Sequence, residues 1–224
     1  MASWVVHLRI GKALLKDLDN IDLIPYIVGN LAPDAGTSNI SLLSDTMPSS
    51  DRTHFTVQGS KGIDCERFYR TYLLEDADDR LRSFYIGYFT HLMVDRLWSD
   101  KIVVPTVQKH QEEFLKNHAL LDKVNNDWYA LDYYFLKMNP HFSMLEKLKD
   151  IQTFKNDYID FLSDECLEKL IRNVNHLYQN IHAPKDSQME YLSGEELEKF
   201  IEFAIRQITL EMIHKGIMCD GGCV

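Results

Sequence analysis

The sequence places a histidine and an aspartate four positions apart, His91 and Asp95, in an otherwise apolar stretch at residues 79–98. In a helix both side chains share a sector with Phe84 and Tyr88, which indicates that they point inward. A buried carboxylate without a partner costs on the order of 3–5 kcal/mol, so a positive group is expected next to Asp95. Two interpretations follow: an arginine from another helix pairs with Asp95 while His91 is an ordinary core histidine, or both residues bind metal.

Two residues nearer the N-terminus, His7 and Asp34, could belong to the same metal site. His7 shares one face of a predicted helix with Ile10 and Leu14, a pattern that a packed core histidine also explains. Asp34 lies in the segment GNLAPDAG, residues 29–36, where a proline and two bracketing glycines predict a tightly shaped loop. On its own, such an aspartate is more commonly explained by an Asx turn or a cap.

Further candidates lie in less regular surroundings. His54 stands beside Phe55 in a loop at residues 37–61 that is rich in Ser, Thr, Asp and Pro, and this pair indicates an anchored segment. His118 and Asp122 repeat the four-residue spacing of the central pair. Because their neighbours are polar, a solvated helix face competes with metal binding as the explanation of that second pair.

Composition narrows the classes of function. The chain has 224 residues, 45% of them hydrophobic, so no metal is needed merely to hold its core together. The formal net charge of -10 and the absence of a Lys/Arg run argue against nucleic acid as a partner. No apolar run approaches the roughly 18 residues of a transmembrane segment, and the N-terminal residues lack the pattern of a signal peptide. We therefore expect a cytoplasmic protein whose oligomeric state stays open.

Helical periodicity dominates the chain, so we expect an all-α fold, a single-domain multi-helix bundle spanning residues 1–224. Metal ligands would come mainly from residues 1–122, and helices within residues 142–216 would complete the bundle. Ser3 is the expected N-cap of the first helix, and Ser193 begins a capping box. Helices are predicted at residues 4–18, 64–74, 79–98, 103–121, 125–136, 145–149, 154–162, 166–181 and 197–213.

Imidazoles and carboxylates from separate segments suit zinc, whose catalytic sites use nitrogen and oxygen ligands and keep one position for water. Four stretches also carry a resemblance: Trp4-Val5-Val6-His7, Gly29-Asn30-Leu31-Ala32-Pro33-Asp34, Thr53-His54-Phe55 and Phe89-Thr90-His91-Leu92-Met93-Val94-Asp95. In this order they resemble the bacterial zinc-dependent phospholipase C family, whose fold is shared with the S1/P1 nucleases. The resemblance implies an all-helical domain with a metal cluster in a cleft that hydrolyses a phosphate ester.

The resemblance also implies roles for individual residues. Asp34, His54 and His91 would hold one zinc ion, and His7 would hold another, with Asp95 shared or nearby. Asp34 would in addition be the catalytic base for the attacking water. His118 and Asp122 are the local matches to the ligands of a further ion.

The resulting hypothesis is a phosphoesterase that binds one to three Zn²⁺ ions, or other divalent metals, and hydrolyses its substrate with metal-activated water. The expected substrate is a small phosphodiester or a phospholipid headgroup. The alternatives are a non-catalytic helical binding or sensor protein with a structural metal site, and a nuclease of the same fold. A phosphohydrolase of the His-Asp type is disfavoured because the chain has no His-Asp dipeptide.

Overall fold

The computed structural model of the chain describes residues 1–36, 48–60, 62–75, 77–116, 120–183 and 189–219. This part of the chain is built of helices, and it contains an isolated antiparallel bridge between Thr56 and Ile63. The predicted all-α fold is therefore confirmed. None of the helices described combines the length and the apolar character needed to cross a bilayer.

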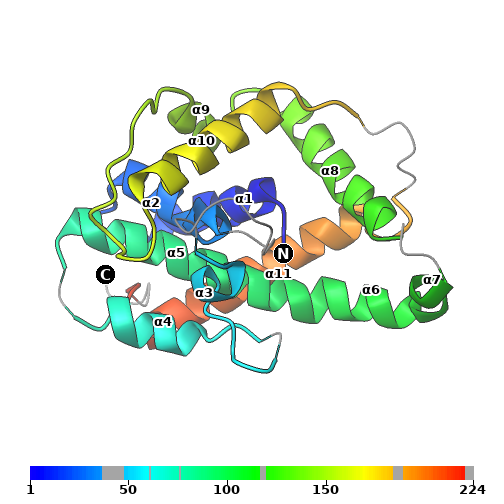
Figure 1. Cartoon of the computed structure of the whole chain (residues 1–224), viewed down its shortest axis with the longest axis horizontal. Helices are drawn as coiled ribbons and strands as arrows, with labels where there is room; N and C mark the ends of the chain where they lie inside the picture. The colour runs from blue at the N-terminus through cyan, green and yellow to red at the C-terminus, as the bar shows by residue number, and fades with distance from the viewer. Residues whose placement is uncertain (37–47, 61, 76, 117–119, 184–188, 220–224) are drawn as a thin grey trace.

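Eleven α-helices are assigned in the described part of the chain. They are α1 (Trp4–Leu14), α2 (Leu23–Leu31), α3 (Ser50–Thr53), α4 (Cys65–Tyr72), α5 (Asp79–Trp98), α6 (Val104–Lys109), α7 (Gln111–Lys116), α8 (Leu120–Met138), α9 (Ser143–Lys149), α10 (Asp164–Gln179) and α11 (Gly194–His214). Single 3-10 turns follow α1 and α2, at Leu15–Asp17 and Ala32–Ala35, and a π-helical turn, Ser99–Val103, follows α5. Figure 1 shows α2 lying between α5 and α10, with α1 beside it.

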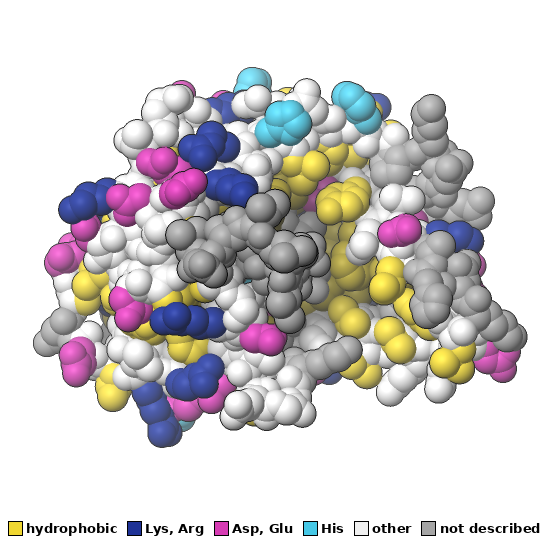
Figure 2. All heavy atoms as spheres, in the orientation of Figure 1, with side chains coloured by type: hydrophobic (Ala, Val, Ile, Leu, Met, Phe, Trp, Pro, Cys, Tyr) yellow, Lys and Arg dark blue, Asp and Glu magenta, His cyan; other side chains and the backbone are white. Residues whose placement is uncertain are grey.

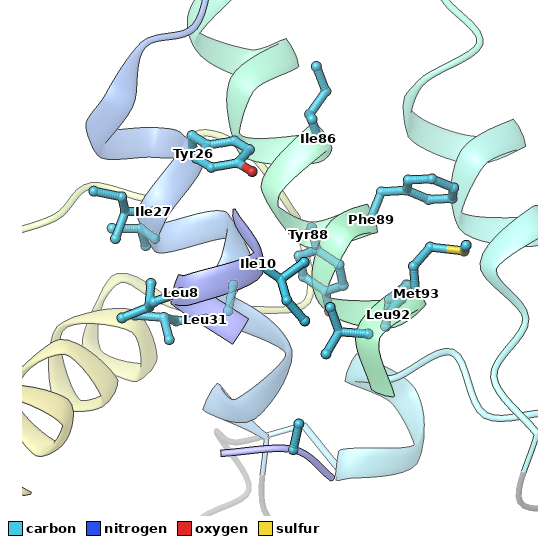
Figure 3. Close-up of a cluster of buried hydrophobic side chains, with 14 of the residues drawn as sticks. Leu8, Ile10, Tyr26, Ile27, Leu31, Ile86, Tyr88, Phe89, Leu92 and Met93 are labelled. Carbon is cyan, nitrogen blue, oxygen red and sulfur yellow. The ribbon is translucent and has the colours of Figure 1, made fainter. Parts of the chain in front are cut away.

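The central helix is α5, because it is buried on every side. Its residues 83–95 are buried without interruption, as expected of a helix that is apolar almost all round. Figure 3 shows side chains of α1, α2 and α5 meeting in one cluster, among them Leu8, Tyr26 and Leu92. The same core extends to Met218, so the C-terminal helices complete the bundle.

Two glycines bring α2 and α5 unusually close together. A Cβ on Gly29 would overlap the carbonyl oxygen of Phe84, and a Cβ on Gly87 would overlap the carbonyl oxygen of Tyr26. Packed helices normally keep their axes about 8–10 Å apart, and the absence of a side chain at both glycines removes the usual spacer. The crossing therefore fixes α2 against the stretch of α5 that leads to His91.

The start of the GNLAPDAG segment differs from the predicted loop. Gly29 lies inside α2, which runs on to Leu31, and Ala32 remains helical with φ -55° and ψ -33° although Pro33 follows it. The N–H of Ala32 donates to the carbonyl oxygens of Gly29 and Val28, so it closes the last turn of α2. The prediction failed because proline disfavours a helical residue before it without forbidding one.

Residues 154–162 were predicted to be helical, and this prediction is wrong. The side chain of Asn156 accepts hydrogen bonds from the N–H groups of Tyr158 and Ile159 and donates to the carbonyl oxygens of Ile159 and Leu162. A short polar side chain that bonds to its neighbouring backbone competes with the helical hydrogen bonds. The segment is therefore an irregular connection between α9 and α10.

Other boundaries shift by smaller amounts. The helix predicted at residues 103–121 is divided at His110 into α6 and α7, and the helix predicted at 125–136 is longer, as α8. Both predicted caps are confirmed: the Ser3 side chain accepts from the Val6 N–H, and Ser193 forms a complete capping box. Ser3 thereby fixes the start of the helix that carries His7.

Candidate metal centre

Four separate elements bring five of the seven predicted ligand residues together. They are His7 on α1, Asp34 in the 3-10 turn after α2, His54 at the C-cap of α3, and His91 and Asp95 on α5. The ligand atoms form two groups of three that share His91, and the atoms within each group lie within 4.8 Å of one another. One group contains His7 and Asp95, and the other contains Asp34 and His54.

Three of these atoms form a nearly regular triangle. His54 Nε2 lies 3.4 Å from His91 Nε2, and both nitrogens lie 3.4 Å from Asp95 Oδ2. Asp34 Oδ1 lies 3.3 Å from His54 Nε2. Ligands held about 2.0 Å from a tetrahedral zinc ion are about 3.3 Å apart, whereas charge-assisted N–H···O bonds measure about 2.7–2.9 Å. The spacing therefore matches ligands around an ion better than a set of direct hydrogen bonds.

Buried polar atoms at this centre lack hydrogen-bond partners within the described part of the chain. They are both ring nitrogens of His7, Oδ1 of Asp34 and Oδ2 of Asp95. Such orphans are rare, because about 90% or more of buried polar groups in proteins are hydrogen-bonded. The side chains of His7 and His91 are 0% exposed and that of Asp95 is 1% exposed, so bulk water does not compensate. A divalent cation would satisfy Oδ1 of Asp34 and Oδ2 of Asp95, so the residues present fit a metal ion.

Backbone carbonyl groups orient two of the imidazoles. His91 Nδ1 lies 2.8 Å from the carbonyl oxygen of Asn30, and His54 Nδ1 lies 3.0 Å from that of Ser50. A carbonyl oxygen only accepts, so each Nδ1 carries the hydrogen and donates it. The Nε2 atom of each ring then faces the other ligands, as in metal sites whose histidines are oriented by an outer hydrogen bond.

One oxygen of each carboxylate accepts a hydrogen bond that holds the side chain in place. Asp34 Oδ2 accepts from the indole Nε1–H of Trp4 at 2.8 Å, and Asp95 Oδ1 accepts from the backbone N–H of Ala2 at 2.9 Å. Both carboxylates keep their second oxygen for the centre. Residues 2–4, at the start of α1, thus contribute two groups that orient the carboxylates. The same helix carries the candidate ligand His7.

Burial and mutual charge set the protonation of the centre. Burial, aided by the neighbouring His91, lowers the pKa of His7 to about 4, so its ring is neutral at pH 7. Burial also acts to lower the pKa of His54, but the adjacent carboxylates of Asp34 and Asp95 outweigh it and raise that pKa to about 10. Burial opposes ionisation of Asp95, yet the surrounding imidazoles hold its pKa well below the usual range. A metal ion bound here must therefore displace the proton of His54.

Phe55 anchors His54, as its sequence neighbourhood predicted. Its backbone has a φ of 53°, a strained value for a bulky side chain. The ring is buried and packs edge-on against Phe68, Tyr72 and Tyr88, with centroids 5.2–6.3 Å away. This packing holds the turn that places His54 at the centre.

The described part of the chain places no arginine against Asp95. Among the described residues, the ion-pair distances of Asp95 run to His7, His54 and His91. The neighbouring Arg96 instead contacts the sulfur of Met93, at 3.2 Å. Of the two sequence interpretations, the arrangement favours the metal site.

Of the two remaining predicted ligands, the described residues include only Asp122, which is not brought to this centre. Asp122 is exposed in the first turn of α8 and joins neither group of ligands, and His118 lies outside the described residues. Sequence analysis did not assign Trp4 or the Asn30 carbonyl to the site. A signal existed for Trp4, which lies three positions before His7 and so shares a helix face with it. The role of the Asn30 carbonyl depends on the crossing of α2 and α5, which the sequence does not indicate.

A cavity of about 430 Å³ adjoins the centre on the side of Asp34. Its walls include the rings of Trp4, Trp128, Tyr129 and Tyr178, and Asp34 is the only candidate ligand among its described lining residues. The face of the molecule seen in Figure 2 is hollowed near its middle, and hydrophobic side chains gather along the hollow. The centre is thus closed by protein on most sides and adjoins open space next to Asp34.

No protein-family model, no curated protein and no solved structure matches this chain. Inferences about its function therefore start from the geometry of the centre and the cavity.

Proposed function

We propose that this protein is a metal-dependent phosphoesterase, with zinc as the first candidate ion and a phosphodiester or phospholipid-like molecule as substrate. The observation that carries the proposal is the convergence of five His and Asp side chains, several with unpartnered atoms, at the edge of a cavity. A structural zinc site is typically closed by four protein ligands, whereas a catalytic site keeps a position for water or substrate. The position of Asp34 between the ligands and the cavity supports the catalytic type.

Asp34, His54 and His91 would hold the ion, with Asp95 Oδ2 beside the two histidines. A bound zinc ion would supply Lewis acidity and lower the pKa of a coordinated water to about 7. Asp34 faces the cavity, so its carboxylate is placed to orient an attacking water and to accept its proton. Asp95 and the carbonyl of Asn30 would keep His91 fixed while this occurs.

The choice of a phosphate ester rests on the donor set and on the resemblance to zinc-dependent phospholipases C. Among the described residues that line the cavity there is no Lys, Arg or His, so protein side chains would not neutralise a phosphoryl group there. A divalent ion at the centre would provide that neutralisation in a chain whose formal charge is -10.

The direct test compares His91→Ala with His214→Ala, which removes an exposed histidine near the end of α11. We expect zinc-loaded wild type and His214→Ala to contain zinc by elemental analysis and to hydrolyse bis(p-nitrophenyl) phosphate, a nucleotide diester or short-chain lecithin. His91→Ala should lose both the metal and the hydrolysis. Unchanged metal content and activity in His91→Ala would remove the proposal, and tight zinc binding without turnover of any ester would favour a structural metal site.

A further inference from the structure

Trp4 connects the candidate metal centre to the neighbouring cavity. Its indole Nε1–H donates to Asp34 Oδ2 at 2.8 Å, while its ring lines the cavity and meets Tyr178 edge-on at 6.4 Å. The other oxygen of Asp34 lies 3.3 Å from His54 Nε2. One indole therefore selects which carboxylate oxygen faces the centre and also forms part of the surface that a bound molecule would touch.

The cavity suits an uncharged organic group. Trp4, Trp128, Tyr129 and Tyr178 supply aromatic surface, and aromatic rings bind apolar and aromatic groups through burial and edge or offset stacking. Among the described lining residues, Asp34 carries the only charged side chain, so no cationic side chain of the cavity would pair with a negative group. An anionic phosphoryl group would accordingly lie at the metal side, with an uncharged part of the ester in the cavity.

We propose that Trp4 is a positioning residue that orients Asp34 through its N–H, and that the same cavity holds the uncharged organic part of the ester. This inference rests on the proposed function, because it assumes an ion at the centre. Removal of a group that orients a metal ligand typically weakens metal binding 10–100-fold. Loss of an aromatic wall that touches only the organic group instead weakens substrate binding.

The chain offers a matched control in Trp128. It lines the same cavity, but the Nε1 of Trp128 has no hydrogen-bond partner among the described residues. Trp4→Phe and Trp128→Phe therefore remove the same chemical group from the same cavity, and only the first removes a hydrogen bond to Asp34. An isosteric replacement of the Trp4 indole by benzothiophene deletes the N–H with the ring shape kept, which guards against a folding defect in Trp4→Phe.

The experiment measures zinc affinity by competition with a chromophoric chelator, the absorption spectrum of the Co²⁺ form, and kcat and KM on bis(p-nitrophenyl) phosphate. We expect Trp4→Phe and the benzothiophene variant to weaken zinc 10–100-fold, to change the Co²⁺ spectrum and to lower kcat. Trp128→Phe should keep zinc affinity within about twofold and the Co²⁺ spectrum unchanged, and should raise KM. Equal zinc affinities and spectra in the Trp4 and Trp128 variants would overturn the positioning role, and an unchanged KM in Trp128→Phe would overturn the cavity assignment.

These outcomes are separable from a failure of the proposed function. If wild type binds neither zinc nor Co²⁺, the metal centre itself is refuted. If wild type binds zinc and hydrolyses the diester while the two tryptophan variants behave alike, only the inference about Trp4 fails.

Discussion

The imidazole rings of His7 and His91 are stacked, with centroids 3.8 Å apart and planes inclined by 2°. His91 belongs to both groups of candidate ligands, but its Nδ1 is occupied by the carbonyl of Asn30, so only Nε2 remains for an ion. One nitrogen lone pair binds one ion, so the two groups cannot both be completed through His91. Of the one to three ions that the sequence suggested, we therefore expect one to be held tightly.

Replacement of His7 tests which group holds that ion. We expect His7→Ala to retain zinc on Asp34, His54 and His91, with affinity reduced about 10–100-fold because Asp95 loses a neighbour that orients it. His54→Ala should lose far more, because it removes a ligand. Chelator competition on both variants gives the answer, and the reverse order of affinities would place the ion with His7 and Asp95.

The glycine crossing of α2 and α5 should be intolerant of substitution. In Gly87→Ala the new Cβ meets the backbone of Tyr26, which cannot move aside as a side-chain tip can, so α2 must shift. Such overpacking costs about 1–3 kcal/mol and occasionally more. Because α2 carries the carbonyl that orients His91, zinc affinity should fall as well. Urea unfolding of the metal-free protein and chelator competition measure the two effects.

Gly194→Ala is the matched control for that substitution. A Cβ there meets Leu131 Cδ2 at 3.7 Å, an ordinary van der Waals distance. We expect a change within about 1 kcal/mol, since the helix propensities of Ala and Gly differ by about that amount. Equal stability and zinc affinity in both glycine variants would contradict the role assigned to the crossing.

Phe55→Ala should affect both stability and the centre. Truncation of a buried phenylalanine costs about 3–5 kcal/mol, and here it also releases the strained turn that carries His54. We therefore expect lower unfolding free energy together with weaker zinc binding. Phe203→Ala, at a half-buried position on α11, should reduce stability less and leave zinc affinity unchanged. Zinc affinity that is unaffected by Phe55→Ala would show that the turn is held by other contacts.

Much of the centre could be predicted because its ligands carry local signals. His91 and Asp95 interrupt an apolar helix at one-turn spacing, and a buried polar pair demands a partner. His7 was expected to point inward from its helix face, and Phe55 marked an anchored histidine in a polar segment. Each of these signals depends on a few neighbouring residues, which is the range over which sequence patterns are informative.

The features that sequence analysis missed depend on contacts between distant segments. Gly29 and Gly87 permit close packing only because α2 lies across α5. In the sequence alone, Gly29 indicates a turn. The N–H of Trp4 reaches a carboxylate 30 positions away, and that of Ala2 reaches one 93 positions away. The side chain of Asn156 bonds to the neighbouring backbone and prevents the helix predicted there. Hydrophobic periodicity does not detect such hydrogen bonds.

Asp132 gives a pH dependence that is separate from the ligands. Its side chain is buried and accepts hydrogen bonds from Ser3 Oγ at 2.8 Å and from Tyr178 OH at 3.2 Å. Burial raises the pKa of Asp132 to about 7, although the two hydrogen bonds act to lower it. The unfolded chain has a pKa of about 3.9 at this residue, so between about pH 4 and 7 the folded state binds more protons. Its contribution to stability is thus complete below about pH 4 and is lost as pH rises through 7.

Asp132→Asn should remove this dependence. The unfolding free energy of the variant minus that of wild type, measured by urea denaturation of metal-free protein, should increase by about 2–3 kcal/mol from pH 5 to pH 8. The difference cancels the titration of other groups, including the histidines of the centre. Asp122→Asn, at an exposed position on α8, is the control substitution of the same chemical type. A pH-independent difference for Asp132→Asn would mean that Asp132 is ionised throughout this range and that its two hydrogen bonds outweigh burial.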